Sequence, residues 1–548
     1  MIKKVLTVVL AAFMLACSVG VFAACGGDGS TGGPADPSKE SGDVVLSFLH
    51  AGTLQPSTDK VEAAVSEYVK EKLGFGVEFK MTNVFNCNSD YQNWLLTNQE
   101  IDIMNVFTGS DSFVTDKSAR EISSLLTPEI APYLSEELKD RSDVTLKGQD
   151  DKIYGVSVFP KNLLGGYSYV VRKDVLEKAG LYSETAAEGK YTDYQQISYS
   201  DLDTIFAAIK QTMPTNSAGQ NVYPCSAMNG QDYMAALVPY DKLGTESYPL
   251  AVLMVDPVTG EFGDEVVNYY KTDGYKQFVQ KMGEWNDKGY VHPDAETTST
   301  SLNDFFDSER FVGVVLQTSP ELQYQWETDR LKAKGGTELV MLPMSTEYFY
   351  VTNPMQSLMI PAKSKRPARA MQFIDLLYSD EYLVNLIMYG VEGEEWEFVD
   401  EEHGYISETE PGSRTDNYVV GGFWGDYNMV YTFVPYGQDV TEIVADMEEV
   451  EKQTAIFEER SLAHMSPAAG FIYWPNRSLS TTIRNINAQV MTRYFLTLAV
   501  GNGTKGSDGT FTGPGSTYED FIEALDNARI ETIVADKQEQ YSAWQAKQ

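Results

Sequence analysis

The folded part of the chain opens with a strand, a helix and a second strand, and this order restricts the possible architectures. Val44–His50 is an apolar run of strand length, and Val77–Thr82 is another. Between them apolar side chains recur every three or four residues, and Gly74 ends this helical pattern. We expect Asp59 and Glu62 to cap the helix. Such an order is typical of an α/β layer structure with a parallel sheet.

The same alternation continues along the chain. A helical pattern over residues 91–98 is followed by a strand pattern over 102–107, which repeats the opening unit. Further on, the apolar stripe Leu202–Ile209 predicts a helix that ends at Pro214. These patterns extend the α/β layer structure well beyond the first unit.

The first 24 residues have the pattern of a secretory signal peptide. Two early lysines are followed by the apolar run Val5–Ala16 and then by small residues. We therefore expect residues 1–24 to be removed on export and residues 25–42, rich in Gly, Ser and Pro, to form a flexible leash. An uncleaved membrane helix over Val5–Ala24 is the alternative, because about 20 apolar residues can span a bilayer. Both interpretations place the rest of the chain outside.

Composition argues against several function classes. The chain has 79 acidic and 42 basic residues and a net charge of −37, whereas a nucleic-acid partner requires clustered Lys and Arg. The four His residues show no metal-ligand spacing, and no G-x-S-x-G nucleophile motif is present. A G-x-G-x-x-G match at residues 27–32 lies in the leash, outside any strand-to-helix context. We therefore expect no nucleic-acid partner, no catalytic residues, no cofactor and no metal site.

The four cysteines do not suggest a disulfide framework. Cys17 would leave with the signal peptide, and Cys25 stands directly after it. The wide separation of Cys87 and Cys225 favours two free thiols, although a pair is left open. The arrangement around Cys25 resembles a bacterial lipoprotein signal, in which this Cys is lipidated and becomes the new N-terminus. The resemblance implies an acyl (palmitate) membrane anchor at Cys25.

Two motifs in the middle of the chain carry a second resemblance. Asp150–Val156 (DDKIYGV) is followed by Tyr167–Leu181 (YSYVVRKDVLEKAGL). This order resembles the extracellular solute-binding proteins of ABC transporters, family 1, which have a "kiYGvP" strand and then a "lviRKDwLdklGl" segment that enters the second lobe. The local pattern agrees, since a short β-branched strand turns directly into a helix closed by Gly180. Because glycine can absorb a backbone rotation, Gly165 and Gly166 are expected to be hinge residues.

Residues 352–398 resemble the return of the same family to its first lobe. That return is a strand, then "skhPEaAlrFlDylyS", then "yGieG". Pro367 suits the first turn of a helix, and Asp380 is expected to cap the next helix. Thr352 and Pro354 would mark the crossing back and complete the hinge.

The tail of the chain adds a third match. Residues 466–471 (SPAAGF), the helical run 479–498 and residues 518–548 resemble the helical C-terminal module of one subgroup of these lipoproteins. Together the resemblances imply an α/β, two-lobed periplasmic-binding-protein type II fold with a helical C-terminal extension. The implied parts are a signal peptide (1–24), a leash (25–42), a first α/β lobe (43–165 and 353–398), a second α/β lobe (167–352 and 399–465) and a helical module packed on the second lobe (466–548).

A sugar site needs flat aromatic surfaces for stacking and fixed polar groups for the hydroxyls. In doubly wound lobes the ligand lies at the carboxyl ends of the strands. This rule selects residues that end or follow predicted strands, together with aromatic and polar loop residues, although many loop residues are simply solvated. The candidate ligand-binding residues are His50, Phe107, Thr108, Asn229, Asp232, Gln317, Thr318, Tyr348, Trp396, Phe423, Trp424 and Asp426.

The resemblance and the aromatic loops together predict a function. We expect a monomeric, surface-anchored solute-binding protein of an ABC importer, not an enzyme. It would capture a carbohydrate, an oligosaccharide, by hinge closure and deliver it to permease subunits in the membrane. The alternatives are an extracellular glycoside hydrolase, for which the many carboxylates could supply a pair, and a glycan-binding surface protein not coupled to import.

Overall fold

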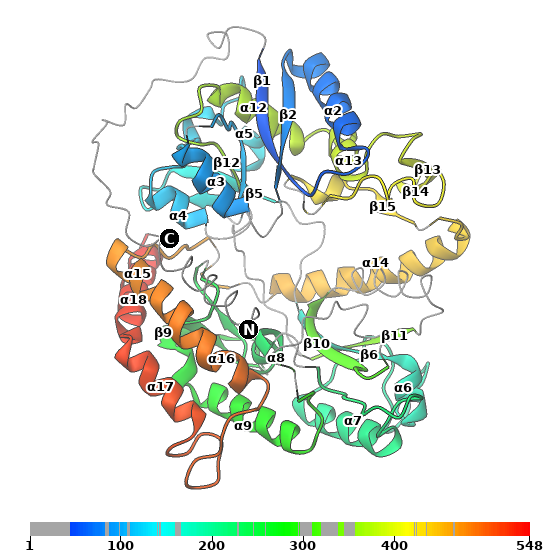
Figure 1. The fold of residues 1–548 in the computed structure, drawn as a ribbon, viewed down its shortest axis with the longest axis vertical. Coiled ribbons are helices and arrows are strands. Elements are labelled where there is room, and N and C mark those ends of the chain that lie inside the picture. Colours follow the sequence, from blue (N-terminus) through cyan, green and yellow to red (C-terminus); the bar gives the residue numbers. More distant parts are fainter. Residues whose placement is uncertain are drawn as a thin grey trace, which may run out of the picture. The chain divides into compact units, whose positions relative to one another are not determined.

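The computed structural model (Figure 1) describes most of the chain beyond the expected leash. The signal peptide, the leash and Cys25 lie outside the described residues. The described residues are 44–82, 87–97, 99–106, 110–139, 141, 144–158, 166–226, 230–244, 246–257, 259–293, 295, 309–318, 338–344, 357–420, 422, 425–434, 436–463, 466–468 and 470–547. No helix in these stretches is both long enough and apolar enough to cross a membrane.

The first lobe contains a parallel pair of strands and a mixed sheet of four. β1 (Val45–Ala51) and β2 (Gly76–Thr82) run parallel from Val45↔Gly76 to Ala51↔Thr82. A parallel bridge from Phe48 to Ile103 links β1 to the chain that enters β3 (Met104–Val106). The four-stranded sheet has the order β3-β12-β5-β4, in which β12 (Ser357–Met359) is antiparallel to its neighbours. The other two strands are β5 (Ile153–Ser157) and β4 (Thr145–Lys147).

The helix between β1 and β2 forms where its apolar pattern predicts, but its cap differs. α2 (Thr58–Leu73) buries Val61, Val65 and Val69, and Gly74 ends it at φ 80°. The expected cap at Asp59 is wrong, because the helix starts earlier, with Ser57 as N-cap, and Asp59 lies in the first turn. The Ser57 hydroxyl makes no capping bond to α2 because it donates to Glu395, a residue far along the chain.

The return to the first lobe follows the sequence prediction closely. α12 (Pro367–Leu377) has Pro367 at its first turn. α13 (Glu381–Tyr389) is capped by the Asp380 side chain, which accepts from the backbone N–H of Leu383. The remaining helices of this lobe are short: α3 (Cys87–Leu96), α4 (Ser110–Thr115), η2 (Ser123–Leu125) and α5 (Leu134–Glu137).

Residues 399–450 pack on the first lobe, so for this stretch the assignment of 399–465 to the second lobe is wrong. β13 (Trp396–Asp400), β14 (Tyr405–Glu408) and β15 (Thr432–Phe433) form a small sheet, with η5 (Tyr427–Met429) before β15. Asn385 of α13 bonds to the backbone of Met429 and Tyr431 at 2.7 and 2.9 Å. The long helix α14 (Val440–Ala463) places Met447 and Val450 against Tyr405 of β14.

The second lobe is built on an antiparallel sheet, not on the parallel sheet expected from the opening unit. β6 (Gly166–Arg172) lies between β10 (Gly313–Thr318) and β11 (Leu339–Pro343), and both neighbours run antiparallel to it. Residues 223–226 extend this sheet through parallel bridges to 311 and 314. The other elements are α6 (Lys173–Lys178), α7 (Tyr199–Thr212), α8 (Gly230–Leu237), β7 (Tyr240–Asp241), β8 (Ala251–Val255), β9 (Phe262–Asn268), η4 (Tyr269–Lys271) and α9 (Asp273–Asp287).

The C-terminal helices share one hydrophobic core with the second lobe. The tail consists of α15 (Arg477–Asn485), a π-helical turn η6 (Ile486–Met491), α16 (Thr492–Ala499), α17 (Thr517–Asn527) and α18 (Ile530–Gln545). The Tyr518 hydroxyl donates to the carbonyl of Tyr270 at 2.9 Å, and Gln538 accepts from the N–H of Val266 at 2.6 Å. In Figure 1 these helices lie beside β9 and α9.

Residues 471–474 give side chains to two cores in alternation. Phe471 and Tyr473 belong to the core of the second lobe, whereas Ile472 and Trp474 belong to a core of the first lobe that includes Leu49. In an extended segment successive side chains point to opposite faces, which explains this alternation. The backbone of Trp474 is held by Gln540 of α18, whose side chain bonds to its N–H at 3.1 Å and its carbonyl at 2.9 Å.

Candidate ligand-binding site

The strands of the first lobe bring their carboxyl ends to one edge. The last residues of β1 and β2 are register partners, and Val106 of β3 and Ser157 of β5 both pair with Ser357. Because β12 is antiparallel to these strands, it begins at the edge where they end. This edge is the place where a ligand binds in α/β sheets of this kind.

The second lobe has an equivalent edge. Gly166 pairs with Thr318 and Ser168 with Pro343, so β6 begins where β10 and β11 end. Residues 223–226 run parallel to β10, with Ser226 opposite Val314. The chain between β5 and β6, and the chain between β11 and β12, therefore start and finish at these two edges. Of the predicted hinge residues, Gly166 is the first residue of β6, and Gly165, Thr352 and Pro354 lie outside the described residues.

His50 lies at the edge of the first lobe but inside its core. Its side chain is 2% exposed and stacks on Phe79 with ring centroids 4.5 Å apart. Its Nε2 lies 3.2 Å from the Tyr418 hydroxyl, which itself donates to the carbonyl of Ile387 at 2.7 Å. The Tyr418 hydroxyl uses its proton in the bond to Ile387, so the proton in the bond between His50 and Tyr418 must be on Nε2 of His50. Burial lowers the pKa of His50 to about 4, so a neutral His50 positions Tyr418.

Two other candidates are buried as well. Trp396 is the first residue of β13, and its indole N–H donates to the carbonyl of Gly390 at 2.9 Å. Asp426 caps η5 and accepts from the backbone and side-chain nitrogens of Asn428 at 2.9 and 2.8 Å. The sequence predicted both residues as exposed loop residues, because a polar, glycine-rich context is found in exposed loops and in packed turns alike.

The second-lobe edge brings Asp232 and Gln317 together with two tyrosines that the sequence rule missed. Asp232 lies in the first turn of α8. Burial raises the pKa of both Tyr167 and Tyr240, and the negative charge of Asp232 is a smaller cause of the same shift. Gln317 is exposed and is the register partner of Tyr167, while Thr318 is the last residue of β10. Tyr167 starts a strand instead of ending one, so the rule for parallel strands passed over it.

The remaining candidates lie outside the described residues: Phe107, Thr108, Asn229, Tyr348, Phe423 and Trp424. Their described neighbours locate the ends of three connections. Val106 ends β3 at the first-lobe edge, and Gly230 begins α8. Val419 and Asp426 flank Phe423 and Trp424. The backbone N–H of Val419 donates to Gln55, just after β1, and that of Asp426 donates to the carbonyl of Leu377 at 3.3 Å.

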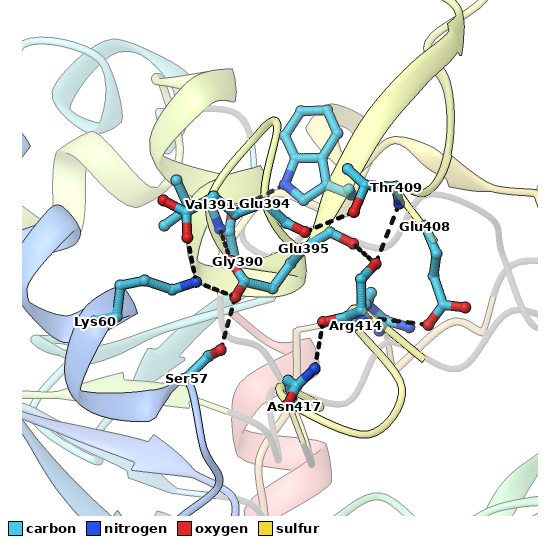
Figure 2. A network of polar contacts seen from close by, with 12 residues as sticks. Ser57, Lys60, Gly390, Val391, Glu394, Glu395, Glu408, Thr409, Arg414 and Asn417 are labelled. Atoms are coloured by element: carbon cyan, nitrogen blue, oxygen red, sulfur yellow. Dashed lines mark hydrogen bonds and ion pairs between the residues drawn. The ribbon is translucent and has the colours of Figure 1, made fainter. Parts of the chain in front are cut away.

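A buried polar network fixes the chain that leads to Val419 (Figure 2). Glu395 is 2% exposed, and its carboxylate accepts from the Ser57 hydroxyl at 2.7 Å, Lys60 Nζ at 2.5 Å and the N–H of Val391 at 2.9 Å. Its backbone carbonyl accepts from the Ser413 hydroxyl at 2.8 Å. The network ties the start of α2 to the turn that follows β14.

Glu408 stabilises the same turn from its other side (Figure 2). Its carboxylate accepts from the backbone N–H groups of Gly412, Arg414 and Thr415 at 3.1, 3.2 and 2.7 Å. Burial alone would raise the pKa of Glu408, but these bonds hold it below its usual value. The turn therefore carries Tyr418 and Val419 on a fixed support at the carboxyl end of β1.

The described residues offer no metal site, since no three His, Cys, Asp or Glu side chains in that part of the chain lie close enough together to bind an ion. The polar groups at the two edges are instead carboxylate, amide and hydroxyl groups beside aromatic rings. Such groups suit the hydroxyls and the apolar faces of a sugar.

Comparison with known proteins supports the fold over most of the chain. No family model matches. A carbohydrate ABC transporter substrate-binding protein of Streptococcus pneumoniae serotype 4 is 22% identical over 548 residues, covering 97% of each chain. The solved structure of the N-glycan transport solute-binding protein NgtS from S. pneumoniae has a TM-score of 0.69 at 17% identity, covering 92% of this chain and 99% of NgtS.

A second solved structure is the S. pneumoniae ABC-transporter substrate-binding protein FusA in complex with kestose. It has a TM-score of 0.59 at 15% identity and covers 92% of this chain and all of FusA (100%). Both likenesses cover 92% of this chain. The chain thus has the two-lobed α/β fold, with a helical C-terminal extension, of the solute-binding proteins of ABC transporters.

Proposed function

We propose that the chain is a solute-binding protein of an ABC importer and captures an oligosaccharide. The observation that carries this proposal is the fold, shared over 92% of the chain with NgtS and FusA, whose solved complexes hold Man5GlcNAc and kestose respectively. The two strand edges support it, since Tyr167, Asp232 and Gln317 offer a sugar an aromatic ring and fixed hydrogen-bonding groups. The protein binds its ligand and does not transform it.

Capture would proceed by closure of the two lobes. The connections between β5 and β6 and between β11 and β12 act as the hinge, with Gly165, Gly166, Thr352 and Pro354 absorbing the rotation. The ligand stabilises the closed form by its greater affinity for that form. The closed form then docks on permease subunits.

The N-terminal segment would keep the binder near its permease. Residues 1–24 direct export, Cys25 carries the lipid, and the Gly-rich residues 25–42 allow the lobes to open, load and dock. The protein would thus act as an anchored monomer on the extracytoplasmic face. Palmitate labelling tests this anchor. Loss of labelling in Cys25→Ala, with labelling kept in the control Cys17→Ala, would support lipidation at Cys25. Labelling that persists in Cys25→Ala would contradict it.

The first-lobe candidates would supply the stacking platform. Phe423 and Trp424 lie within a short connection whose flanking residues, Val419 and Asp426, are both held on the first lobe. Phe107 and Thr108 follow β3 directly, at the edge where β1 also ends. We propose that the platform of this site faces Asp232 and Gln317 when the lobes close.

Calorimetry of purified residues 30–548 against Man5GlcNAc, kestose and a panel of plant oligosaccharides tests the function. We expect saturable heat with one sugar class and no release of shorter products on long incubation. Product release would instead indicate a glycoside hydrolase. Heat with peptides and with no sugar would overturn the carbohydrate assignment. Binding of a sugar by the protein, without uptake of that sugar by the cells that make it, would indicate a surface glycan binder.

A further inference from the structure

A stretch near the C-terminus has no acidic residue, in a chain that is otherwise strongly acidic. The whole chain has 79 acids in 548 residues, about one in seven, yet no Asp or Glu occurs between Glu459 and Asp508. A stretch of this length would be expected to contain several. Its Lys and Arg residues are Arg460, Arg477, Arg484, Arg493 and Lys505, and the middle three lie on α15 and α16.

The helices α15, η6 and α16 follow one another directly and have one buried and one exposed face (Figure 1). The buried face enters the core of the second lobe through Ile483, Ile486, Val490, Phe495 and Leu498. Arg477, Arg484 and Arg493 are exposed, and so are the residues between them at helical spacing: Thr481, Asn485, Ala488, Gln489 and Thr492. The three arginines therefore share one face along about 24 Å of helix. We call this exposed surface the arginine face.

The positive charge of the arginine face is not neutralised within the described part of the chain, where no carboxylate forms an ion pair with its three arginines. The Arg484 guanidinium donates to the Thr481 hydroxyl at 3.2 Å, and that of Arg493 lies 4.9 Å from the centroid of the Tyr494 ring. The adjacent helices α17 and α18 carry exposed acids, but these do not come close enough to pair: Asp520, Glu523 and Glu539 are examples.

Other exposed basic side chains of the protein have carboxylate partners. Lys139, Lys178 and Lys452 each pair with an acid three or four residues earlier on the same helix or turn. Such pairs cancel most of the local charge seen from outside. The arginine face is thus a cationic surface on a protein with a net charge of −37.

The composition of the arginine face suits a lipid surface better than a protein partner. Protein interfaces depend on aromatic or apolar anchors that become buried, whereas Leu496, 41% exposed, is the one large apolar side chain exposed on α16, and the Tyr494 ring is half-buried. A layer of phosphate groups requires only positive charge, and a guanidinium binds phosphate oxygens with two parallel hydrogen bonds.

The proposed lipid anchor would bring the protein to such a layer without fixing its orientation. The leash, residues 25–42, can extend to about 60 Å at about 3.4 Å per residue, so more than one face can turn toward the membrane. An anionic membrane repels the acidic faces and attracts a cationic one. Because charges beyond about 8–10 Å are screened, the face nearest the membrane decides the balance.

We infer that the arginine face lies on anionic phospholipid headgroups and orients the anchored protein with its C-terminal helices toward the membrane. This inference depends on the proposed membrane anchorage and goes beyond sugar capture. Each arginine at an anionic surface contributes roughly fivefold to the preference for this orientation, and three contribute about a hundredfold. The contact is at the level of the headgroups, because Leu496 alone does not drive insertion.

Energy transfer to a dye in the membrane measures which face turns toward the bilayer. Residues 26–548 carry a histidine tag in place of Cys25 and are tethered to vesicles through a nickel-chelating lipid. The donor dye is placed at Asn485→Cys, exposed beside Arg484, or at Ala63→Cys, exposed on α2 of the first lobe. The background is Cys87→Ser, and Cys225 is buried and does not react.

The vesicles are made of phosphatidylcholine alone or of phosphatidylcholine mixed with phosphatidylglycerol. We expect at least about twofold higher transfer from Asn485→Cys on the anionic vesicles, and no increase from Ala63→Cys. The increase should disappear at about 1 M salt, where the Debye length is about 3 Å.

A triple variant tests the arginine face itself. In Arg477→Gln with Arg484→Gln and Arg493→Gln, the increase on anionic vesicles should be lost. The matched control is Lys139→Gln with Lys178→Gln and Lys452→Gln, which removes the same total charge from side chains that already have carboxylate partners. This control should keep the increase. Unchanged thermal midpoints show that both variants fold.

The outcomes separate the inference from the proposed function. An increase that is lost in the arginine variant and kept in the lysine variant supports the inference. Equal transfer on the two kinds of vesicle overturns it, and so does an equal loss in the two variants, which would make net charge responsible. An increase at both dye positions would show adhesion without orientation and would also overturn it. The tether replaces the lipid and no sugar is present, so no outcome depends on lipidation of Cys25 or on sugar binding.

Discussion

His50 shows how a polar residue at a strand end can serve the site without touching the ligand. The neutral imidazole lies between Phe79 and Tyr418, and its Nε2 proton binds the Tyr418 hydroxyl. Tyr418 directly precedes Val419, from which the chain continues to Phe423 and Trp424. His50 is therefore a positioning residue, and its environment makes it sensitive to pH.

We predict that His50 makes the protein less stable as the pH falls from about 6.5 to about 4. Burial lowers the pKa of His50 to about 4 in the folded state, so below pH 6.5 the unfolded chain binds the proton and the folded chain does not. A shift of this size corresponds to at most about 3 kcal/mol. Urea unfolding at pH 7, 5.5 and 4.5 measures this dependence.

His50→Gln should flatten that dependence, because glutamine remains neutral over the whole range. His403→Gln is the control, since His403 is exposed and its pKa is raised by the bond to Asp400. A His50→Gln protein that loses as much stability between pH 7 and 4.5 as the native chain would contradict the assignment.

Side-chain partners explain which residues the sequence could and could not place. Strand ends were predicted to within a residue or two, so His50 and Gln317 lie at the expected edges. The burial of His50 was not predicted, because Tyr418, which covers one face of its ring, comes from a turn more than 360 positions away. Tyr167 was missed because an antiparallel strand presents its start, and not its end, to the site.

At the scale of elements, the junction between α2 and β13 depends on one buried carboxylate. Glu395 satisfies the Ser57 hydroxyl, Lys60 and the N–H of Val391, and its backbone holds Ser413. These contacts fix the small sheet β13-β14-β15 on the first lobe.

We predict that Glu395→Gln lowers the free energy of unfolding by about 1–3 kcal/mol, because the amide NH2 would face donors where the carboxylate accepts. Glu394→Gln is a matched control. Glu394 also pairs with Lys60, at 2.6 Å, but its side chain is 58% exposed, so its loss should cost at most about 0.5 kcal/mol. Equal losses in the two variants, measured by urea unfolding, would show that the buried bonds do not matter.

A second prediction concerns the glycine that begins this junction. Gly390 has a φ of 90°, and an added Cβ would come within 2.9 Å of Glu395 Cγ. We expect Gly390→Ala to destabilise the first lobe by more than about 1 kcal/mol, because alanine is strained at this positive φ and the Glu395 side chain must also move. Gly393→Ala separates the two causes, since Gly393 also has a positive φ but open space around it. A larger melting shift for Gly393→Ala would contradict this account.

The elements themselves were largely predictable, and their partners were not. Apolar periodicity gave α2, and the rules for Pro and Asp at helix starts gave the beginnings of α12 and α13. The cap of α2 was misplaced because Ser57 bonds to Glu395, a contact that local sequence does not contain. Residues 399–450 were assigned to the wrong lobe for the same reason, since bonds such as that of Asn385 to Met429 are long-range.

On the scale of the whole molecule, the C-terminal helices complete the second lobe. Phe521, Ile530 and Ile533 are fully buried in the same core as Tyr270 and Tyr275. Lys271 of η4 pairs with Asp526 and Glu531 at 2.7 and 2.9 Å. The order of motifs predicted this module, but the resemblance alone could not show which side chains it shares with β8, β9 and α9.

We predict that deletion of residues 477–548 abolishes cooperative folding of the second lobe, because it exposes this shared core to water. The measurement is near-ultraviolet circular dichroism, supported by limited proteolysis with sequencing of the protected fragments. Glu523→Ala, an exposed change on α17, should have little effect in the full chain and serves as the control. A single melting transition in the truncated chain, close to that of the full chain, would contradict the prediction.

The segment Phe471–Trp474 also limits the order in which the protein can be made. Its alternating side chains enter a core in each lobe, so neither core is complete until residue 474 has been synthesised and has reached its place. During translation, more than four-fifths of the chain therefore emerges before either lobe can be sealed. A ribosome that stalls before this segment releases a chain with two open cores, which chaperones and proteases will recognise.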